Sequence, residues 1–174
     1  IRAVVTVNRS ESAFFSLEIL EIPASKDCST FLFFRYAGKW ANNAQTNNPS
    51  KKEIPGIKII GADPYGSILG GGNEVYPYKV EGIGYDFFPE VLDNSIIDEY
   101  VKVNDKDTFR TAKSLIKDEG LLIGGSSGTA VFAALEAAKS LKKGQNCLVI
   151  LPDGIRNYMR KFVSDDWMKE NDLI

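Results

Sequence analysis

Histidine is absent from this chain of 174 residues, and its absence excludes several kinds of active site. Nucleophiles that depend on a Ser-His or Cys-His pair are excluded within the chain. Zinc and haem sites held by histidine are excluded for the same reason, because imidazole is the commonest metal ligand. We therefore expect no metal centre.

Other shortages narrow the class of protein further. The two cysteines, Cys28 and Cys147, are too few for a disulfide framework. No apolar run approaches the length of a membrane span and no signal peptide is visible, so we expect a cytoplasmic protein. The 21 basic and 23 acidic residues nearly balance, which predicts no nucleic-acid surface. The first residue is Ile1 rather than Met, which indicates a fragment or a processed product.

The first 53 residues carry no chemical motif. Three β-prone runs, at 4–7, 13–22 and 31–37, are followed by an Asn-rich polar stretch that predicts a loop. Strands and helices do not alternate in this part of the chain. We treat residues 1–53 as an unassigned segment, which is divergent, rearranged or wrongly translated.

From residue 54 onward the local signals agree with one another and predict an α/β fold. Asn104 suits the start of a helix and Gly120 its end, while Lys142 and Lys143 suit the last turn of a second helix. The predicted elements are, in order, a strand at 57–63, a helix after 104, a strand at 121–123, a helix at about 129–143, a strand at 147–151 and a final helical region. The spacing predicts a parallel sheet of βαβ units.

Two corners of this predicted fold carry small residues. The sequence GGSSG follows the strand at 121–123, and Pro152-Asp153-Gly154 follows the strand at 147–151. Because carboxyl ends of parallel strands lie at one edge of a sheet, we expect the two corners to converge on a ligand site. Glycines allow close approach, and a helix start offers free N–H groups. A tight turn with ordinary helix capping explains the same residues equally well.

Two further stretches are candidates for a site. EGIGYD, at 81–86, places Gly82 and Gly84 around Ile83, ahead of Tyr85 and Asp86. The alternative interpretation of this stretch is a glycine turn before an aromatic core patch. Asp86 is equally well explained as a substrate-loop residue or as a simple turn residue. Asp63-Pro64, at the end of the strand at 57–63, by itself predicts only a turn.

Four long motifs keep one order along the chain: KIIGADPYGSIL, YKVEGIGYDFFPEVLD, EGLLIGGSSGTA and VILPDGIRNYMRKFVSDDWM. Together they resemble the cystathionine β-synthase family, which belongs to fold type II of the pyridoxal-phosphate enzymes. The resemblance covers residues 54–174 and implies the C-terminal half of the catalytic core. Cysteine synthases share GGSSG, but they typically lack the Tyr-Asp after GIG and the last motif.

The resemblance implies roles for individual residues. Ser126 matches the serine beneath the pyridine nitrogen of pyridoxal phosphate, where a neutral hydroxyl does not force the ring nitrogen to be protonated. This suits β-elimination and β-replacement, because the cofactor's electronics are tuned by the protein. The resemblance also assigns residues beside the cofactor ring, which are Gly124, Gly125, Pro152 and Asp153, and residues of a substrate loop, which are Gly82, Gly84, Tyr85 and Asp86.

The implied reaction condenses L-serine with L-homocysteine to cystathionine, in the transsulfuration route of cysteine biosynthesis. The implied assembly is a homodimer or a larger oligomer. Two alternatives stay open. One is a cysteine synthase, which uses O-acetylserine and sulfide, and the other is a non-catalytic pseudoenzyme or partner-binding fragment.

Two family motifs are missing from the sequence. Family members hold the cofactor covalently through a lysine in a Ser-x-Lys-Asp-Arg stretch, and they bind its phosphate with a Gly/Thr-rich loop. The stretch ASKDCST around Lys26 is the nearest imitation, but it lacks the arginine. We therefore assign no catalytic residue and predict that the chain alone is inactive.

Overall fold

The computed structural model describes residues 3–9, 15–19, 30–33, 56–90, 92–142 and 145–174, and it describes side chains from residue 56 onward. Cys28, Lys26 and the Asn-rich stretch lie outside the described residues, as does the predicted helix end at Lys143 and Gly144. Within these ranges no helix is both long and apolar enough to cross a membrane.

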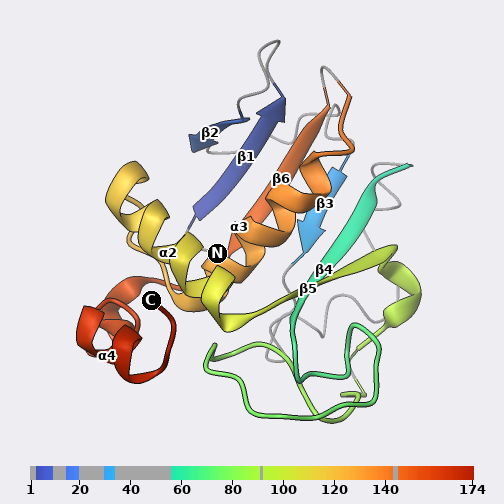
Figure 1. Ribbon diagram of the computed structural model, residues 1–174. Coiled ribbons are helices and arrows are strands. Elements are labelled where there is room, and N and C mark those ends of the chain that lie inside the picture. Colours follow the sequence, from blue (N-terminus) through green and yellow to red (C-terminus); the bar gives the residue numbers. More distant parts are fainter. Residues whose placement is uncertain (1–2, 10–14, 20–29, 34–55, 91, 143–144) are drawn as a thin grey trace.

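A six-stranded mixed sheet forms the centre of the molecule (Figure 1). Its strands, in chain order, are β1 (Ala3–Arg9), β2 (Phe15–Ile19), β3 (Thr30–Phe33), β4 (Lys58–Pro64), β5 (Glu99–Val103) and β6 (Asn146–Leu151). Their order across the sheet is β2-β1-β6-β3-β4-β5. The four strands from β6 to β5 are parallel, whereas β1 runs antiparallel to both β6 and β2. The α/β class with parallel strands is thus confirmed, although one side of the sheet is antiparallel.

Helix α2 (Asp105–Glu119) has the ends that its sequence predicts. The side chain of Asn104 accepts a hydrogen bond from the Asp107 N–H, and this satisfies a donor of the first turn. At the other end the N–H of Gly120 donates to the Leu115 carbonyl. Because both caps are local in sequence, the helix bounds follow from the sequence alone.

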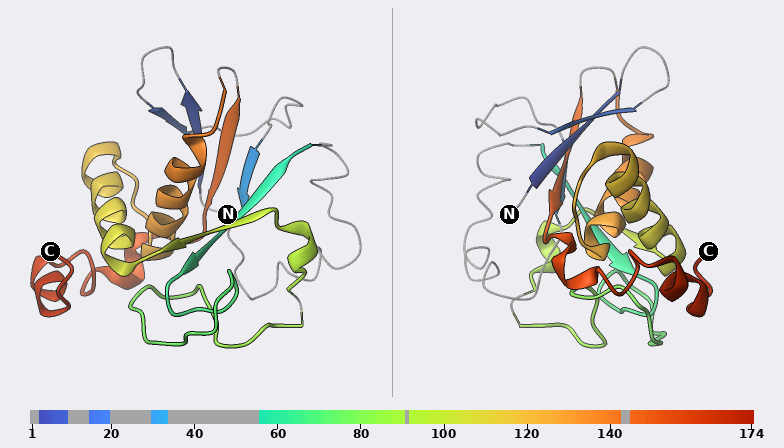
Figure 2. Two further views of the ribbon diagram at one scale, coloured as in Figure 1. Left: turned by 45° about the vertical axis from the view of Figure 1, so that its right-hand side comes forward. Right: turned by 90° about the vertical axis from the view of Figure 1, so that its left-hand side faces the viewer.

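Helix α3 (Gly125–Ala138) packs between the sheet and α2, so it is buried on most of its surface (Figure 2). At Gly128 a Cβ atom would lie 2.2 Å from the Thr108 carbonyl oxygen, so the small residue lets the two helices approach closely. The hydroxyls of Thr108 and Thr129, both fully buried, hydrogen-bond across this contact at 2.9 Å. Each hydroxyl thus provides the hydrogen-bond partner that the other needs in the core.

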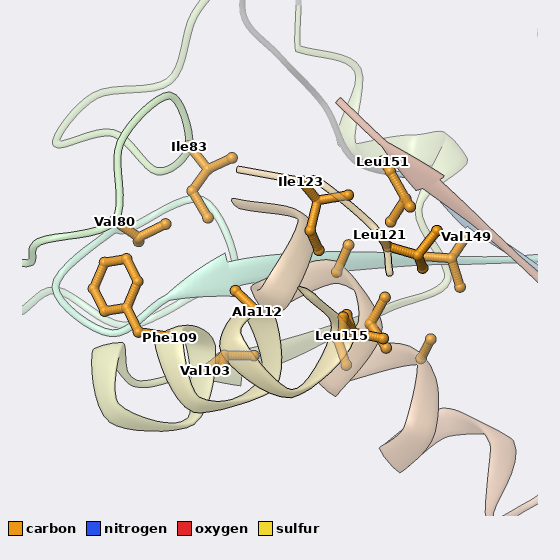
Figure 3. Close-up of a cluster of buried hydrophobic side chains, with 14 of the residues drawn as sticks. Val80, Ile83, Val103, Phe109, Ala112, Leu115, Leu121, Ile123, Val149 and Leu151 are labelled. Atoms are coloured by element: carbon orange, nitrogen blue, oxygen red, sulfur yellow. The ribbon is translucent and has the colours of Figure 1, made fainter. Parts of the chain in front are cut away.

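Two sequence predictions around α3 are wrong. Residues 121–123 form no strand; only Ile123 makes an isolated antiparallel bridge, to Gly154. The helix predicted at about 129–143 begins four residues earlier, at Gly125, and ends at Ala138, before Lys142. The two ends of this short apolar run are buried by packing instead: Leu121 and Ile123 lie in one cluster with Val149 (Figure 3), whereas Leu122 between them is exposed.

The last part of the chain folds against α2 and the start of α3. It contains a 3-10 helix, η3 (Ile155–Tyr158), and helix α4 (Asp165–Glu170); another 3-10 helix, η2 (Asn94–Ile96), precedes β5. Phe109 of α2 stacks on Phe162 with ring centroids 5.3 Å apart, and Trp167 meets it edge-on at 5.5 Å. This aromatic cluster places the segment after β6 beside the small-residue corner.

Candidate functional site

The GGSSG sequence forms the beginning of α3. Gly124 is the N-cap, and Gly125, Ser126 and Ser127 make the first helical turn. Gly124 supplies no side-chain cap, so the helix keeps a positive end, although the Ser127 N–H already donates to the Gly124 carbonyl. Ser126 is 4% exposed and Ser127 is fully buried.

The structure brings this corner to the end of β6, as the sequence analysis expects. The Gly124 N–H donates to the Asp153 carbonyl at 3.2 Å, and the Ile155 N–H donates to the Leu122 carbonyl at 3.1 Å. Together with the bridge between Ile123 and Gly154, these bonds fasten the residues after β6 to the start of α3. Ser126 therefore lies at the carboxyl edge of the parallel strands.

The glycines of this corner are required by the chain's own packing. A Cβ atom at Gly124 would lie 2.0 Å from Asp153 Oδ1 and 2.8 Å from a ring carbon of Tyr158. A Cβ atom at Gly125 would lie 2.8 Å from the Phe109 ring. Packing of the chain itself therefore requires small residues at Gly124 and Gly125, and the expected close approach of a ligand stays a prediction.

Two buried polar atoms at the corner have no protein partner among the described residues: Ser127 Oγ and Asp153 Oδ1. The other carboxylate oxygen of Asp153 accepts a hydrogen bond from the Tyr158 hydroxyl at 2.6 Å. Buried polar atoms without partners are uncommon and costly, and they are characteristic of sites that bind a ligand or water. The sequence analysis missed Tyr158, whose spacing of five residues from Asp153 gave no signal.

The GIG stretch forms a loop whose backbone requires glycine. Gly82 and Gly84 have φ angles of 81° and 77°, in the left-handed region, while Ile83 between them is buried in the core. A Cβ atom at Gly84 would also lie 2.5 Å from the Tyr78 hydroxyl. The Tyr85 ring meets Phe87 edge-on, with centroids 5.0 Å apart.

The part of the chain before this loop is held beside the corner. Asp105, at the start of α2, accepts the N–H groups of Lys79 and Val80 at 2.6 and 3.0 Å. Lys161, which follows η3, forms an ion pair with Glu81. Val80 and Ile83 join the same buried cluster as Ile123 (Figure 3), so the loop and the corner share one side of the core.

Asp86 is exposed, and it acts on its surroundings through its charge. Burial raises the pKa of the Tyr78 phenol, and the negative charges of Asp63 and then Asp86 raise it further. Tyr78 is therefore neutral over the physiological range and can donate a hydrogen bond. The described residues hold no group of histidine, cysteine and acidic side chains suited to a metal ion.

The chain is similar to known pyridoxal-phosphate dependent enzymes. The family described as "Pyridoxal-phosphate dependent enzyme" matches residues 42–153. Cystathionine beta-synthase of Rattus norvegicus is 56% identical over 123 residues, which are 68% of this chain and 22% of that protein. O-acetylserine dependent cystathionine beta-synthase of Bacillus subtilis (strain 168) is 41% identical over 135 residues, covering 78% of this chain and 44% of that protein.

A solved structure shows the same relationship in three dimensions. The O-acetylserine dependent cystathionine beta-synthase from Helicobacter pylori matches with a TM-score of 0.69 and 38% identity, over 78% of this chain and 44% of that one. The chain thus spans less than half the length of each of these relatives. The resemblance drawn from the four sequence motifs is confirmed.

Proposed function

Because this chain belongs to the family of pyridoxal-phosphate dependent enzymes, we propose that it forms part of a lyase that carries out β-replacement on an amino acid. In the finer form of the proposal, the amino acid is L-serine and the incoming nucleophile is the thiol of L-homocysteine, giving cystathionine. The observation that supports it most is the buried Ser126 at the start of α3. Backbone hydrogen bonds of Leu122 and Gly124 fasten this helix start to the residues after β6.

The described residues fit one side of the cofactor. A serine hydroxyl, helix N–H groups and two buried oxygens without partners, Ser127 Oγ and Asp153 Oδ1, offer hydrogen bonds to a polar aromatic ring. We assign Ser126 to the ring nitrogen and the corner from Pro152 to Asp153 to the rim of the ring. When bound, pyridoxal phosphate supplies the electron sink for breaking the bond at the β-carbon.

The described residues do not account for every contact that the cofactor needs. A covalent lysine and a phosphate-binding loop are needed for β-replacement, and neither family motif occurs among the 174 residues. We propose that the loop from Gly82 to Asp86 faces the amino-acid substrate and that the complete protein is a homodimer or larger.

A second candidate differs in the amino-acid substrate. Two of the similar proteins are named O-acetylserine dependent, so O-acetylserine is an alternative to L-serine. The full-length protein should be supplied with serine plus homocysteine, O-acetylserine plus homocysteine, and O-acetylserine plus sulfide. Mass spectrometry of cystathionine and cysteine then separates the three reactions. Formation of neither product, with cofactor bound, would leave the pseudoenzyme alternative.

The role of Ser126 is tested in the same protein by Ser126→Ala and Ser126→Asp. We expect Ser126→Ala to weaken cofactor binding about fivefold, the worth of one neutral hydrogen bond. Ser126→Asp places a carboxylate at the ring nitrogen, so we expect retained binding, a shifted cofactor absorbance and lost β-replacement. Ser140→Ala, at an exposed serine beyond the other end of α3, is the matched control. Equal spectra in all four proteins would refute the assignment.

A further inference from the structure

Two ion pairs join β4 to β5, and they differ sharply in burial. Lys58 and Glu99 pair at 2.5 Å near the start of the strands, with side chains 45% and 51% exposed. Asp63 and Lys102 pair at 2.6 Å at the carboxyl edge, with side chains 2% and 19% exposed. Removing two charges from water is costly, so a buried pair is weak evidence for stability alone. The buried pair lies at the carboxyl edge of the strands, where it can hold the loop that follows β4.

Both members of the buried pair also bind the loop after β4. Asp63 Oδ2 accepts the Gly70 N–H at 2.9 Å, and the Lys102 ammonium donates to the Ser67 carbonyl at 2.5 Å. The pair therefore holds residues 67–70 at two points of the backbone. Ser67 itself is buried, with 3% of its surface exposed.

Ser67 and its neighbour Ile68 hydrogen-bond the loop from Gly82 to Asp86. Ser67 Oγ accepts the Tyr85 N–H at 3.0 Å, and the Ile68 N–H donates to the Tyr85 carbonyl at 2.9 Å. Both polar backbone groups of Tyr85 are thus bound by two consecutive residues. The chain of contacts runs from Asp63 and Lys102 through Ser67 to Tyr85.

We propose that Asp63, Lys102 and Ser67 are positioning residues that fix the backbone of Tyr85 and thereby the shape of the loop from Gly82 to Asp86. They act through the loop and touch no substrate themselves. The link to substrate rests on the proposed function, in which this loop faces the amino acid. The positioning itself is independent of that function.

Hydrogen-deuterium exchange read by mass spectrometry tests the positioning in the chain without cofactor. We expect Ser67→Ala to speed exchange in residues 81–88 about fivefold, because one neutral hydrogen bond is lost. Asp63→Asn should speed it about tenfold, because a charge-assisted contact is lost. In both variants β6, which pairs with neither β4 nor β5, should exchange at its original rate, and this separates loop release from a general loss of stability. Glu99→Gln, at the exposed pair on the same strands, should leave residues 81–88 unchanged.

Unchanged exchange in residues 81–88 in both variants would overturn the proposal, and so would an equal acceleration in the loop and in β6. If Asp63→Asn prevents folding, Ser67→Ala still decides, because it keeps the ion pair intact. In the full-length enzyme we expect Ser67→Ala to raise KM for the amino acid about fivefold with little change in kcat. Released loops with an unchanged KM would refute the substrate role of the loop and leave the positioning intact.

Discussion

Gly124 is the residue at which the candidate site is most sensitive to a single methyl group. Its φ angle of −84° suits any residue, so Gly124→Ala introduces no backbone strain. The new Cβ atom, however, would lie 2.0 Å from Asp153 Oδ1. We expect a loss of about 1–3 kcal/mol in the free energy of unfolding, the usual cost of overpacking. Denaturant unfolding of the protein measures it.

A double-mutant cycle identifies the cause of that loss. If the clash with the carboxylate is responsible, Gly124→Ala should cost clearly less in a background that carries Asp153→Ala, because the colliding atoms are gone. A contact with Tyr158 remains, so we expect partial rather than full relief. Equal costs in both backgrounds would mean that Asp153 is not the obstacle.

Among the helices, the agreement between sequence and structure depends on how local the signals are. Asn104 and Gly120 cap α2 by contacts within a few residues, and the sequence predicts both ends of the helix. Helix α3 is apolar or small on most faces because it lies between the sheet and α2, so no periodic boundary marks its start at Gly125. The run at 121–123 predicts a strand that the structure does not contain, because a short apolar run does not distinguish a strand from irregular backbone with some buried side chains.

Helix α4 is held to α2 by a contact that depends on pH. The Lys113 ammonium hydrogen-bonds Asp165 at 2.5 Å, and this bond, followed by its positive charge, holds the pKa of the Asp165 carboxyl below its ordinary value. A carboxyl whose pKa is lowered by folding contributes stability above the pKa of the unfolded chain, about 3.9. That contribution is lost as the pH falls through the folded value.

We therefore expect Lys113→Gln to loosen α4 near neutral pH and to have a smaller effect in strong acid, where only the bond from Lys113 to the Val163 carbonyl is lost. Asp165 is exposed, so the effect should be local rather than global. Hydrogen exchange of residues 165–170 at several pH values measures it, and an NMR titration should show a higher Asp165 pKa in the variant. Lys139→Gln, which breaks the exposed ion pair between Lys139 and Glu136 at the end of α3, is the control. An unchanged Asp165 titration would contradict this account.

For the whole molecule, the sequence predicts the strands better than their arrangement. β-prone runs foretell β1, β2 and β3, yet no local signal indicates that β3 lies between β4 and β6 or that β1 runs antiparallel. Sheet order depends on contacts far apart in sequence, which local patterns do not encode. The meeting of Gly124 with Asp153 was expected from a strand at 121–123 that the structure does not contain. An isolated antiparallel bridge between Ile123 and Gly154 joins the two corners instead. The role of Ser67 was not, because its partner Tyr85 is 18 residues away.

The missing lysine motif and phosphate loop lead to a prediction for the molecule as a whole. Without a lysine at the cofactor, no group moves the proton at the α-carbon of the amino acid, and without the loop the phosphate is not held. We expect the 174-residue chain, supplied with pyridoxal phosphate, serine and homocysteine, to form no cystathionine detectable by mass spectrometry. A full-length relative from the same family is the positive control.

A second measurement on the same sample separates missing chemistry from missing structure. Borohydride reduction fixes any cofactor bound to a lysine, and peptide mapping then locates it. We expect no single labelled site in the isolated chain, because the family's lysine motif does not occur among the 174 residues. Specific labelling at Lys26 together with cystathionine formation would overturn the prediction and make ASKDCST a working substitute for the family's lysine motif. If the chain unfolds cooperatively and yet shows no labelling, the start of α3 around Ser126 is folded. The failure to bind the cofactor then results from the missing lysine motif and phosphate loop, and not from a failure to fold.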